Sequence, residues 1–303
     1  KAQPPLSGAE ERMSRTFCNP MLEGADPFVL RHGDKYYLYA TNAEEGFRVY
    51  SSADFSAWED CGMCLRAGDA IGKKWFWAPE VMERGGKFYM VYTAEEHLAI
   101  AVSESPTGPF VQTQKKWLSG ERAIDGHFFC DDDGTVYLYY VRLRDGNEIY
   151  VAELDRDLER LDEAHETFLV RAEAEWECRD CRVTEGPFVL KHGGKYYLTY
   201  SANHTRSPDY AVGCAVSRSP RGPFVKAAYN PVLHRNEAAN GVGHHSFVRS
   251  AKGELICVYH RHFDLHTFRP RLVCADRAEF VPCARGDDIL VIHGPTAAPQ
   301  RAL

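Results

Sequence analysis

A repeat that recurs five times is the feature that most constrains the fold of this chain. Each unit reads as an apolar pair, a short turn containing Gly or Asp, and an aromatic strand, which is the pattern of a β-hairpin. The five hairpins are expected at residues 28–39, 81–92, 128–139, 188–200 and 247–259. Repeated units of this kind stack around a common axis, so equivalent positions of different units come together.

Each hairpin is followed by a further strand-like segment. These segments are expected at residues 47–51, 98–102, 148–154, 211–216 and 271–275, and residues 105–111 and 219–225 are near copies that close two of the units. The units begin near residues 26, 78, 125, 185 and 245, at spacings of roughly 47 to 60 residues. We therefore predict an all-β fold, a five-bladed β-propeller forming a single domain over residues 1–303.

The stretch 151–166 is the one departure from the strand pattern. Val151, Leu154, Leu158 and Leu161 fall at helical spacing among charged residues. The stretch begins like a strand and lies between two units. A strand followed by a connecting excursion is expected here, with a short helix as an equal alternative.

Composition limits the classes of partner. The net charge of −7 and the pI near 6.0 give no basic surface for nucleic acid. No apolar run approaches the roughly 18 residues that a membrane span needs. The 16 Tyr, 16 Phe and 5 Trp suit stacking against sugar rings. The composition leaves the oligomeric state open.

The ten cysteines are relevant to the cellular compartment, because thiols stay reduced in some compartments and form disulfides in others. Two C-x-x-C pairs, at residues 61–64 and 178–181, lie too far apart for the usual zinc spacing. Reduced thiols in a cytoplasmic protein are the preferred interpretation. The numbering starts at Lys1 without an initiator Met, so a leader removed before this residue is the open alternative.

Three of the repeat units carry an acid where they begin: Asp26, Asp125 and Glu185. The innermost strand of each propeller blade lines the central channel, so these acids face one funnel. Asp26 and Asp125 occupy level positions, whereas Glu185 lies one residue earlier and approaches from another direction. Each acid alone is also explained as a turn residue or a solvated strand end. Their shared place in the repeat favours one site for glycoside hydrolysis, which needs two carboxyl groups on different sides of a ligand.

These motifs resemble glycoside hydrolase family 43, blade by blade over essentially the whole chain. That family of five-bladed propellers carries an Asp-Pro near the N-terminus, a central Ile-Asp and a Glu-Gly-Pro, matched here by residues 26–27, 124–125 and 185–187. The resemblance implies that Asp26 is the general base and Glu185 the general acid. It implies that Asp125 orients the acid and keeps its pKa high, and that the anomeric centre is inverted.

Two further motifs agree with the resemblance. Trp77, in Trp-Ala-Pro-Glu, matches the family's second-blade motif, whose Trp flanks the sugar. Core packing is the equal alternative for Trp77 and the preferred one for Trp75. Arg271 resembles the last-blade Arg that reaches a sugar hydroxyl or the base, with an ordinary surface Arg as the alternative.

Histidines supply the last candidates. His244, in Gly-Val-Gly-His, matches the fifth-blade His that lies on the axis and often holds a metal ion through water. His245 follows where many relatives have Asn, so which imidazole faces the axis stays open. A structural calcium or sodium ion on the axis is one expectation, with a packed or hydrogen-bonded His244 as the alternative, and hydrolysis by paired carboxylates needs no cofactor. For His260, His262 and His266 ordinary packing is preferred to a metal site.

These observations predict an inverting exo-glycoside hydrolase that removes pentose residues from plant cell-wall polysaccharides or oligosaccharides. An α-L-arabinofuranoside is the first candidate substrate, and a β-D-xyloside is the second; endo-arabinanase action stays open. A non-catalytic glycan-binding propeller is a rival, although no acid of the three is lost. A propeller phosphorylase would need a phosphate pocket, for which Arg261, Arg269 and Arg271 are available.

Overall fold

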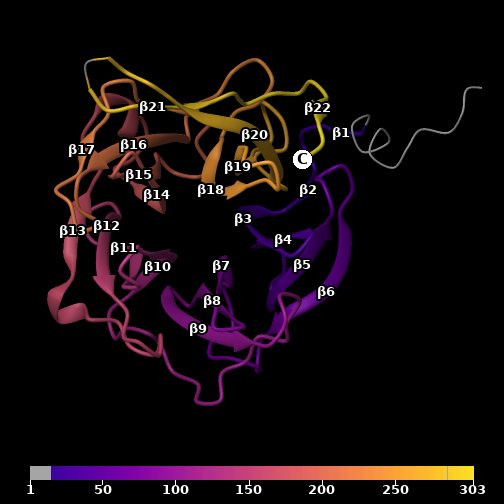
Figure 1. Cartoon of the computed structure of the whole chain (residues 1–303), viewed down its shortest axis with the longest axis vertical. Coiled ribbons are helices and arrows are strands. Elements are labelled where there is room, and N and C mark those ends of the chain that lie inside the picture. Colours follow the sequence, from indigo (N-terminus) through magenta and orange to yellow (C-terminus); the bar gives the residue numbers. More distant parts are fainter. Residues whose placement is uncertain (1–14, 285) are drawn as a thin grey trace, which may run out of the picture.

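Five antiparallel sheets surround one axis in the computed structural model, which describes residues 15–284 and 286–303 (Figure 1). The predicted five-bladed β-propeller is confirmed. The first 14 residues of the domain expected over 1–303 lie outside the described ones. The blades follow one another in sequence, and in each the innermost strand comes first.

The strands of the five blades are as follows. Blade 1 contains β3 (Ala25–His32), β4 (Lys35–Thr41), β5 (Gly46–Ser52) and β6 (Glu59–Arg66), and blade 2 contains β7 (Trp77–Arg84), β8 (Lys87–Ala94) and β9 (His97–Ser103). Blade 3 contains β10 (Ala123–Cys130), β11 (Val136–Arg142), β12 (Glu148–Glu153) and β13 (Thr167–Val170). Blade 4 contains β14 (Thr184–His192), β15 (Lys195–Ala202), β16 (Ala211–Ser217) and β17 (Val225–Lys226). Blade 5 contains β18 (Gly243–Arg249), β19 (Leu255–Arg261) and β20 (Leu272–Val281), with β21 (Ile289–Ile292) paired to β20.

Segments from the two ends of the chain close the ring. The short strand β2 (Leu22–Glu23) pairs with β20 as an outer strand of blade 5. Next to it, β1 (Thr16–Phe17) pairs with β22 (Gln300–Arg301) (Figure 1). Residues near the N-terminus are thus hydrogen-bonded to the last blade.

The core consists of five apolar clusters, one at each interface between neighbouring blades. The cluster between blades 1 and 2, for example, contains the buried side chains of Tyr39, Phe47, Met90 and Tyr92. The other clusters join blades 2 and 3, 3 and 4, 4 and 5, and 5 and 1 in the same way. Each blade is therefore held by apolar burial on both of its faces.

The excursion at residues 151–166 contains no α-helix. β12 ends at Glu153, and Leu154 forms an isolated bridge with Leu161 around a turn in which Leu158 has a φ of 59°. Leu158 and Leu161 are buried between blades 2 and 3, and one 3₁₀ turn, η1 (Glu163–His165), follows. The helical alternative is wrong, because the chain folds back here as a loop and buries these leucines in the core between blades 2 and 3. No helix in the described part of the chain has the length and apolar character to cross a membrane.

The cysteine pairs occupy unrelated places. Cys61 and Cys64 lie on β6, where the former is exposed and the latter buried, because residues three apart on a strand point to opposite faces. Cys178 and Cys181 lie in the connection before β14. All ten cysteines are free thiols.

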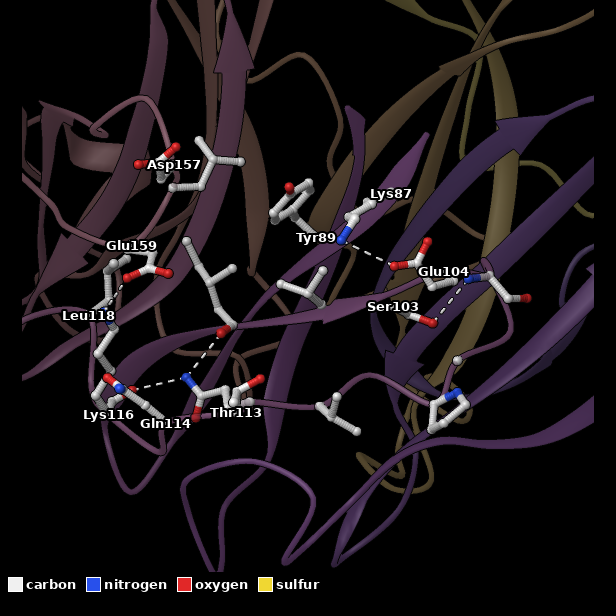
Figure 2. A pocket seen from close by; sticks show the side chains of 18 residues that line it. Lys87, Tyr89, Ser103, Glu104, Thr113, Gln114, Lys116, Leu118, Asp157 and Glu159 are labelled. Atoms are coloured by element: carbon white, nitrogen blue, oxygen red, sulfur yellow. Dashed lines mark hydrogen bonds and ion pairs between the residues drawn. The ribbon is translucent and has the colours of Figure 1, made fainter. Parts of the chain in front are cut away.

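Blade 2 differs from the others because its sheet has three strands. The loop after β9 covers part of the open edge, through a bridge between Val102 and Val111 and a hydrogen bond from Gln112 Nε2 to Ile100 O. A cavity of about 730 Å³ lies beside this edge, crossed by ion pairs of Lys87 with Glu104 and of Lys116 with Glu159 (Figure 2). None of the three candidate acids lines it, so we place the candidate site elsewhere.

Candidate active site

The five inner strands share a β-bulge at one position of the repeat. The register with the second strand shifts there in every blade, and the bulge residue has a left-handed backbone. The bulge residues and their φ angles are Asp26 (52°), Ala78 (45°), Asp125 (57°), Gly186 (53°) and His244 (43°). Bulges re-aim side chains, and here all five bulge residues line one small cavity between the inner strands.

The structure places the acids as the repeat predicts. Asp26, Asp125 and His244 occupy equivalent bulge positions, and Glu185 directly precedes the bulge of its strand. Trp77 holds the place in blade 2 that Glu185 holds in blade 4. Equivalent strand positions of different blades thus carry different side chains around the axis.

Asp26 is a buried carboxyl surrounded by donors. Thr41 Oγ1 donates to its Oδ2 at 2.6 Å, and an Arg271 guanidinium nitrogen donates to its Oδ1 at 3.0 Å. Burial alone would raise the pKa of Asp26, but the charges of Arg271 and His244 outweigh it and hold the pKa well below its usual value. Asp26 is therefore a carboxylate throughout the neutral range.

Glu185 differs from Asp26, because its surroundings raise the pKa of its carboxyl. Tyr210 donates its hydroxyl proton to Glu185 Oε1 at 2.7 Å. Burial, followed by the negative charge of Asp125, raises the pKa of Glu185 to about 7. The Asp125 carboxylate is held close to Glu185, because its Oδ2 accepts a hydrogen bond from the Gly186 backbone N–H at 3.1 Å. Burial raises the pKa of Asp125 as well.

His244 is the imidazole that faces the acids. Its Nδ1 lies 3.3 Å from Asp26 Oδ1 and 3.9 Å from Asp125 Oδ2. Burial alone would lower the pKa of His244, but the surrounding carboxylates outweigh it and raise the pKa. His245 instead points between blades, where its Nε2 lies 2.6 Å from Thr199 Oγ1, and burial lowers its pKa to about 3.

The small cavity between the inner strands is lined in part by Asp26 and Asp125. Its volume is about 20 Å³, enough for roughly one water molecule, and residues of all five inner strands line it. His245 Nδ1 is buried there without a hydrogen-bond partner, but among residues 15–284 and 286–303 no three His, Cys, Asp or Glu side chains are grouped to bind a metal. These groups fit a calcium or sodium ion only if water supplies most of its ligands beside His244, and that ion stays a prediction.

Two other histidines have structural hydrogen bonds. His260 is fully buried, accepts the Asp26 backbone N–H on its Nδ1 at 3.1 Å, and stacks on Tyr210 with ring centroids 5.6 Å apart. His262 Nε2 bonds to the Thr205 carbonyl at 2.8 Å. Both therefore support the walls of the acid cluster.

The two tryptophans at the start of blade 2 differ from expectation. Trp75 is 47 % exposed, so the preferred core-packing interpretation is wrong for it; Phe76, 2 % exposed, fills the core instead. The Trp75 ring stacks against the partly buried Trp77, with centroids 6.0 Å apart and planes 15° apart. The backbone N–H of Ala78 donates to Thr41 Oγ1, which binds Asp26, so Trp77 begins next to the acid cluster.

Arg271 is not an ordinary surface residue. Its side chain is 14 % exposed and binds Asp26. Arg261 instead donates to the Ala238 carbonyl, and the exposed Arg269 lies over the Phe268 ring at 5.3 Å. Of the three arginines considered for a phosphate pocket, Arg271 alone donates to one of the acids.

Sequence reasoning missed Thr41 and Tyr210, which contact the acids, and it named His260 without predicting its contact with Asp26. Thr41 and His260 occupy the same register position on the second strands of blades 1 and 5. A polar residue at the end of an aromatic strand was the available signal. Tyr210 lies in the loop before β16 and had no repeat signal.

The acid cluster of this five-bladed propeller holds a buried carboxylate and a carboxyl of raised pKa. These are the two groups that a glycoside hydrolase requires. Sequence comparison agrees. The profile of "Glycosyl hydrolases family 43" matches residues 17–281, and the chain belongs to this family of glycoside hydrolases.

Several relatives have assigned activities. A solved structure described as an endo-1,4-β-xylanase from Bacteroides thetaiotaomicron is 38% identical, covers 92% of this chain and 98% of its own, and superposes with a TM-score of 0.87. A β-xylosidase of Xylanibacter ruminicola is 29% identical over 67% of this chain and 70% of its own length. An extracellular exo-α-(1→5)-L-arabinofuranosidase of Streptomyces avermitilis is 28% identical over 82% of this chain and 56% of its own.

Proposed function

We propose that this protein is an inverting exo-glycoside hydrolase that releases pentose residues from plant cell-wall polysaccharides or oligosaccharides. The observation that carries the proposal is that two carboxyls of one cluster have different surroundings, which shift their pKa values in opposite directions. Asp26 is held as a carboxylate by Arg271 and His244, whereas Glu185 has a pKa of about 7 beside Asp125. One group can accept a proton at the pH at which the other still carries one.

The reaction follows from these two states. Asp26 takes a proton from a water molecule, and the oxygen of that water attacks the anomeric carbon. Glu185 gives its proton to the glycosidic oxygen, and the carbon–oxygen bond to the leaving group breaks. The products are a sugar of inverted configuration and an alcohol, and both carboxyls then exchange protons with solvent. Asp125 supports the protonated state of Glu185 by its negative charge.

An α-L-arabinofuranoside is the first candidate substrate. The exo-acting arabinofuranosidase relative, which aligns with 82% of this chain, supports this choice. A β-D-xyloside is the second candidate, because the relatives also include a β-xylosidase and a structure described as an endo-1,4-β-xylanase. Sugar identity and exo action are the parts of the proposal that substrate assays must decide.

Removal of either carboxyl tests the proposal. Asp26→Asn and Glu185→Gln should each lower kcat/KM on a natural oligosaccharide roughly 10²- to 10⁴-fold or more, while circular dichroism and the melting temperature show a folded protein. Glu185→Gln should retain more activity on an aryl glycoside, whose leaving group needs little protonation. Glu104→Gln, an exposed acid of the blade 2 edge, is the matched control.

The assay uses 4-nitrophenyl α-L-arabinofuranoside and β-D-xyloside, with NMR detection of the anomer released first. Full activity on the natural oligosaccharide in Asp26→Asn or Glu185→Gln would refute the assignment of these groups. Release of the retained anomer would refute inversion. Turnover of the xyloside alone would move the second candidate into first place.

A further inference from the structure

A second cavity opens in blade 4, between the connection that leads into β14 and the connection that leads into β18. Its volume is about 290 Å³, close to the lower end of small-molecule sites, which hold roughly 300–1,000 Å³. Trp176, Ala211 and Pro231 give it an apolar lining, and Arg179, Asp209 and Arg235 provide charged groups. It therefore has the size and chemistry for one sugar residue rather than a long chain.

The Trp176 ring is fixed in place. It belongs to the 3₁₀ turn η2 (Glu175–Glu177), and it stacks on Tyr200 with centroids 6.3 Å apart. A Cβ atom on Gly213 would lie 2.7 Å from the indole, so only glycine lets the ring lie against β16. Glu177, fully buried, anchors the turn by accepting hydrogen bonds from the backbone of Glu173 and Ala174. A rigid aromatic platform costs little entropy on binding.

The charged groups are also preorganised. Asp209 Oδ1 lies 3.1 Å from an Arg179 guanidinium nitrogen and 3.3 Å from Arg235 Nε. One carboxylate oxygen thus forms ion pairs with two guanidiniums. Asn203 holds the two sides of the cavity together, because its Nδ2 donates to the carbonyls of Trp176 and Asp209. Planar charged groups beside an aromatic ring suit the hydroxyls and the apolar face of a sugar.

The cavity lies two strands outward from the general acid. Thr184, which directly precedes Glu185, pairs with Ala202, and Ala202 pairs with Ala211 of the cavity wall. Asp209 also lies in this wall, and the next residue, Tyr210, donates to Glu185. Glu185 gives its proton to the leaving oxygen in the proposed reaction, so a leaving portion that extends outward along blade 4 would meet this cavity.

We propose that this cavity is a sugar-binding subsite for the leaving portion of the substrate, in which a sugar ring stacks on Trp176 and its hydroxyls bind Arg179, Asp209 and Arg235. The inference rests on the proposed function and deepens it. It means that the enzyme recognises the glycan chain beyond the scissile bond, as well as the terminal residue that it removes.

Trp176→Ala and Arg235→Ala test the subsite. The two substrates are xylotriose carrying one arabinofuranosyl branch, whose leaving portion is an oligosaccharide, and 4-nitrophenyl α-L-arabinofuranoside, whose leaving portion is a small aryl group. Each variant should lose roughly three- to tenfold more kcat/KM on the oligosaccharide than on the aryl glycoside, mainly through KM. Phe168→Ala, which removes a 45 % exposed aromatic ring from blade 3, is the matched control and should change neither.

Binding of xylotriose, followed by isothermal titration, gives a readout independent of turnover. Weaker binding by threefold or more in both variants supports the subsite. Equal losses on the two substrates, or unchanged xylotriose binding, overturn it. If the unmodified protein hydrolyses neither substrate, the proposed function fails, and the xylotriose titration still decides the subsite. Arg235 is 53 % exposed in its side chain, so its variant remains informative if Trp176→Ala does not fold.

Discussion

Single residues in the acid cluster set the pH range of the reaction. Asp26 must be ionised and Glu185 protonated, so kcat/KM should be highest between their two pKa values. Above pH about 7 the rate should fall as Glu185 loses its proton. On the acid side the rate should persist below the usual range of an aspartate, because the pKa of Asp26 is lowered. A pH profile of kcat/KM on a natural oligosaccharide, whose leaving group needs protonation, checks both limbs; a rise in rate above pH 8 would contradict the roles.

Tyr210 affects the alkaline limb of this pH profile, which Glu185 sets. Its hydroxyl donates to Glu185, and this hydrogen bond acts to lower the pKa of the carboxyl. Tyr210→Phe should therefore move the alkaline limb to higher pH while the acid limb, set by Asp26, stays in place. A variant with purely structural damage would lose rate equally at all pH values. Tyr196→Phe, which removes a hydroxyl bonded to Asp131 away from the acids, is the matched control.

At the scale of elements, each inner strand is hydrogen-bonded to the preceding blade of the ring through the N–H of its bulge residue. The acceptors for Ala78, Asp125 and His244 are the hydroxyls of Thr41, Thr93 and Ser201, at equivalent ends of second strands. His260 does the same for Asp26, and the Asp125 carboxylate does it for Gly186. The positions of the acids are thus fixed by a ring of hydrogen bonds that passes through all five blades.

Thr93→Val tests this ring. Thr93 is fully buried, and valine keeps its shape but cannot accept the Asp125 N–H at 3.1 Å. A buried N–H without a partner costs about 1–3 kcal/mol, so the free energy of unfolding in urea should fall by that amount. Activity should also fall, because Asp125 is held by this bond. Thr113→Val, at an exposed loop position, should alter neither; a stable and fully active Thr93→Val would show that the ring does not position Asp125.

The same elements show why part of the architecture was predictable. The hairpins repeat an aromatic pattern of period two, and that pattern located the inner strands and the acids on them. The outermost strands carried no such signal: β2 and β17 have two residues each. Trp75 was misassigned because an apolar residue beside a strand usually packs inward, whereas a left-handed backbone with a φ of 57° accompanies its exposed position. Contacts such as that of the Asp26 N–H with His260, which joins blades 1 and 5, depend on packing between blades, which one sequence does not encode locally.

At the scale of the whole molecule, a propeller is stable only when its last blade is joined to its first. Besides the pairing of β2 with β20, Asn19 makes this junction: its Oδ1 accepts the Ala275 N–H at 2.8 Å, and its Nδ2 donates to the carbonyls of Ala275 and Thr296 at 3.0 and 3.1 Å. Each such bond contributes about 0.5–1.5 kcal/mol. The ring is therefore closed by specific polar contacts as well as by apolar burial.

Asn19→Ala should weaken this closure without touching the chemistry. We expect the free energy of unfolding to fall by roughly 2–4 kcal/mol, because three hydrogen bonds are lost together. The kcat at a temperature well below unfolding should stay unchanged, since Asn19 contacts none of the acids. Thermal and urea unfolding measure the first effect, and Gln114→Ala, at an exposed loop position, is the control. A large loss of kcat in a still folded Asn19→Ala protein would mean that ring closure also sets the geometry at the axis.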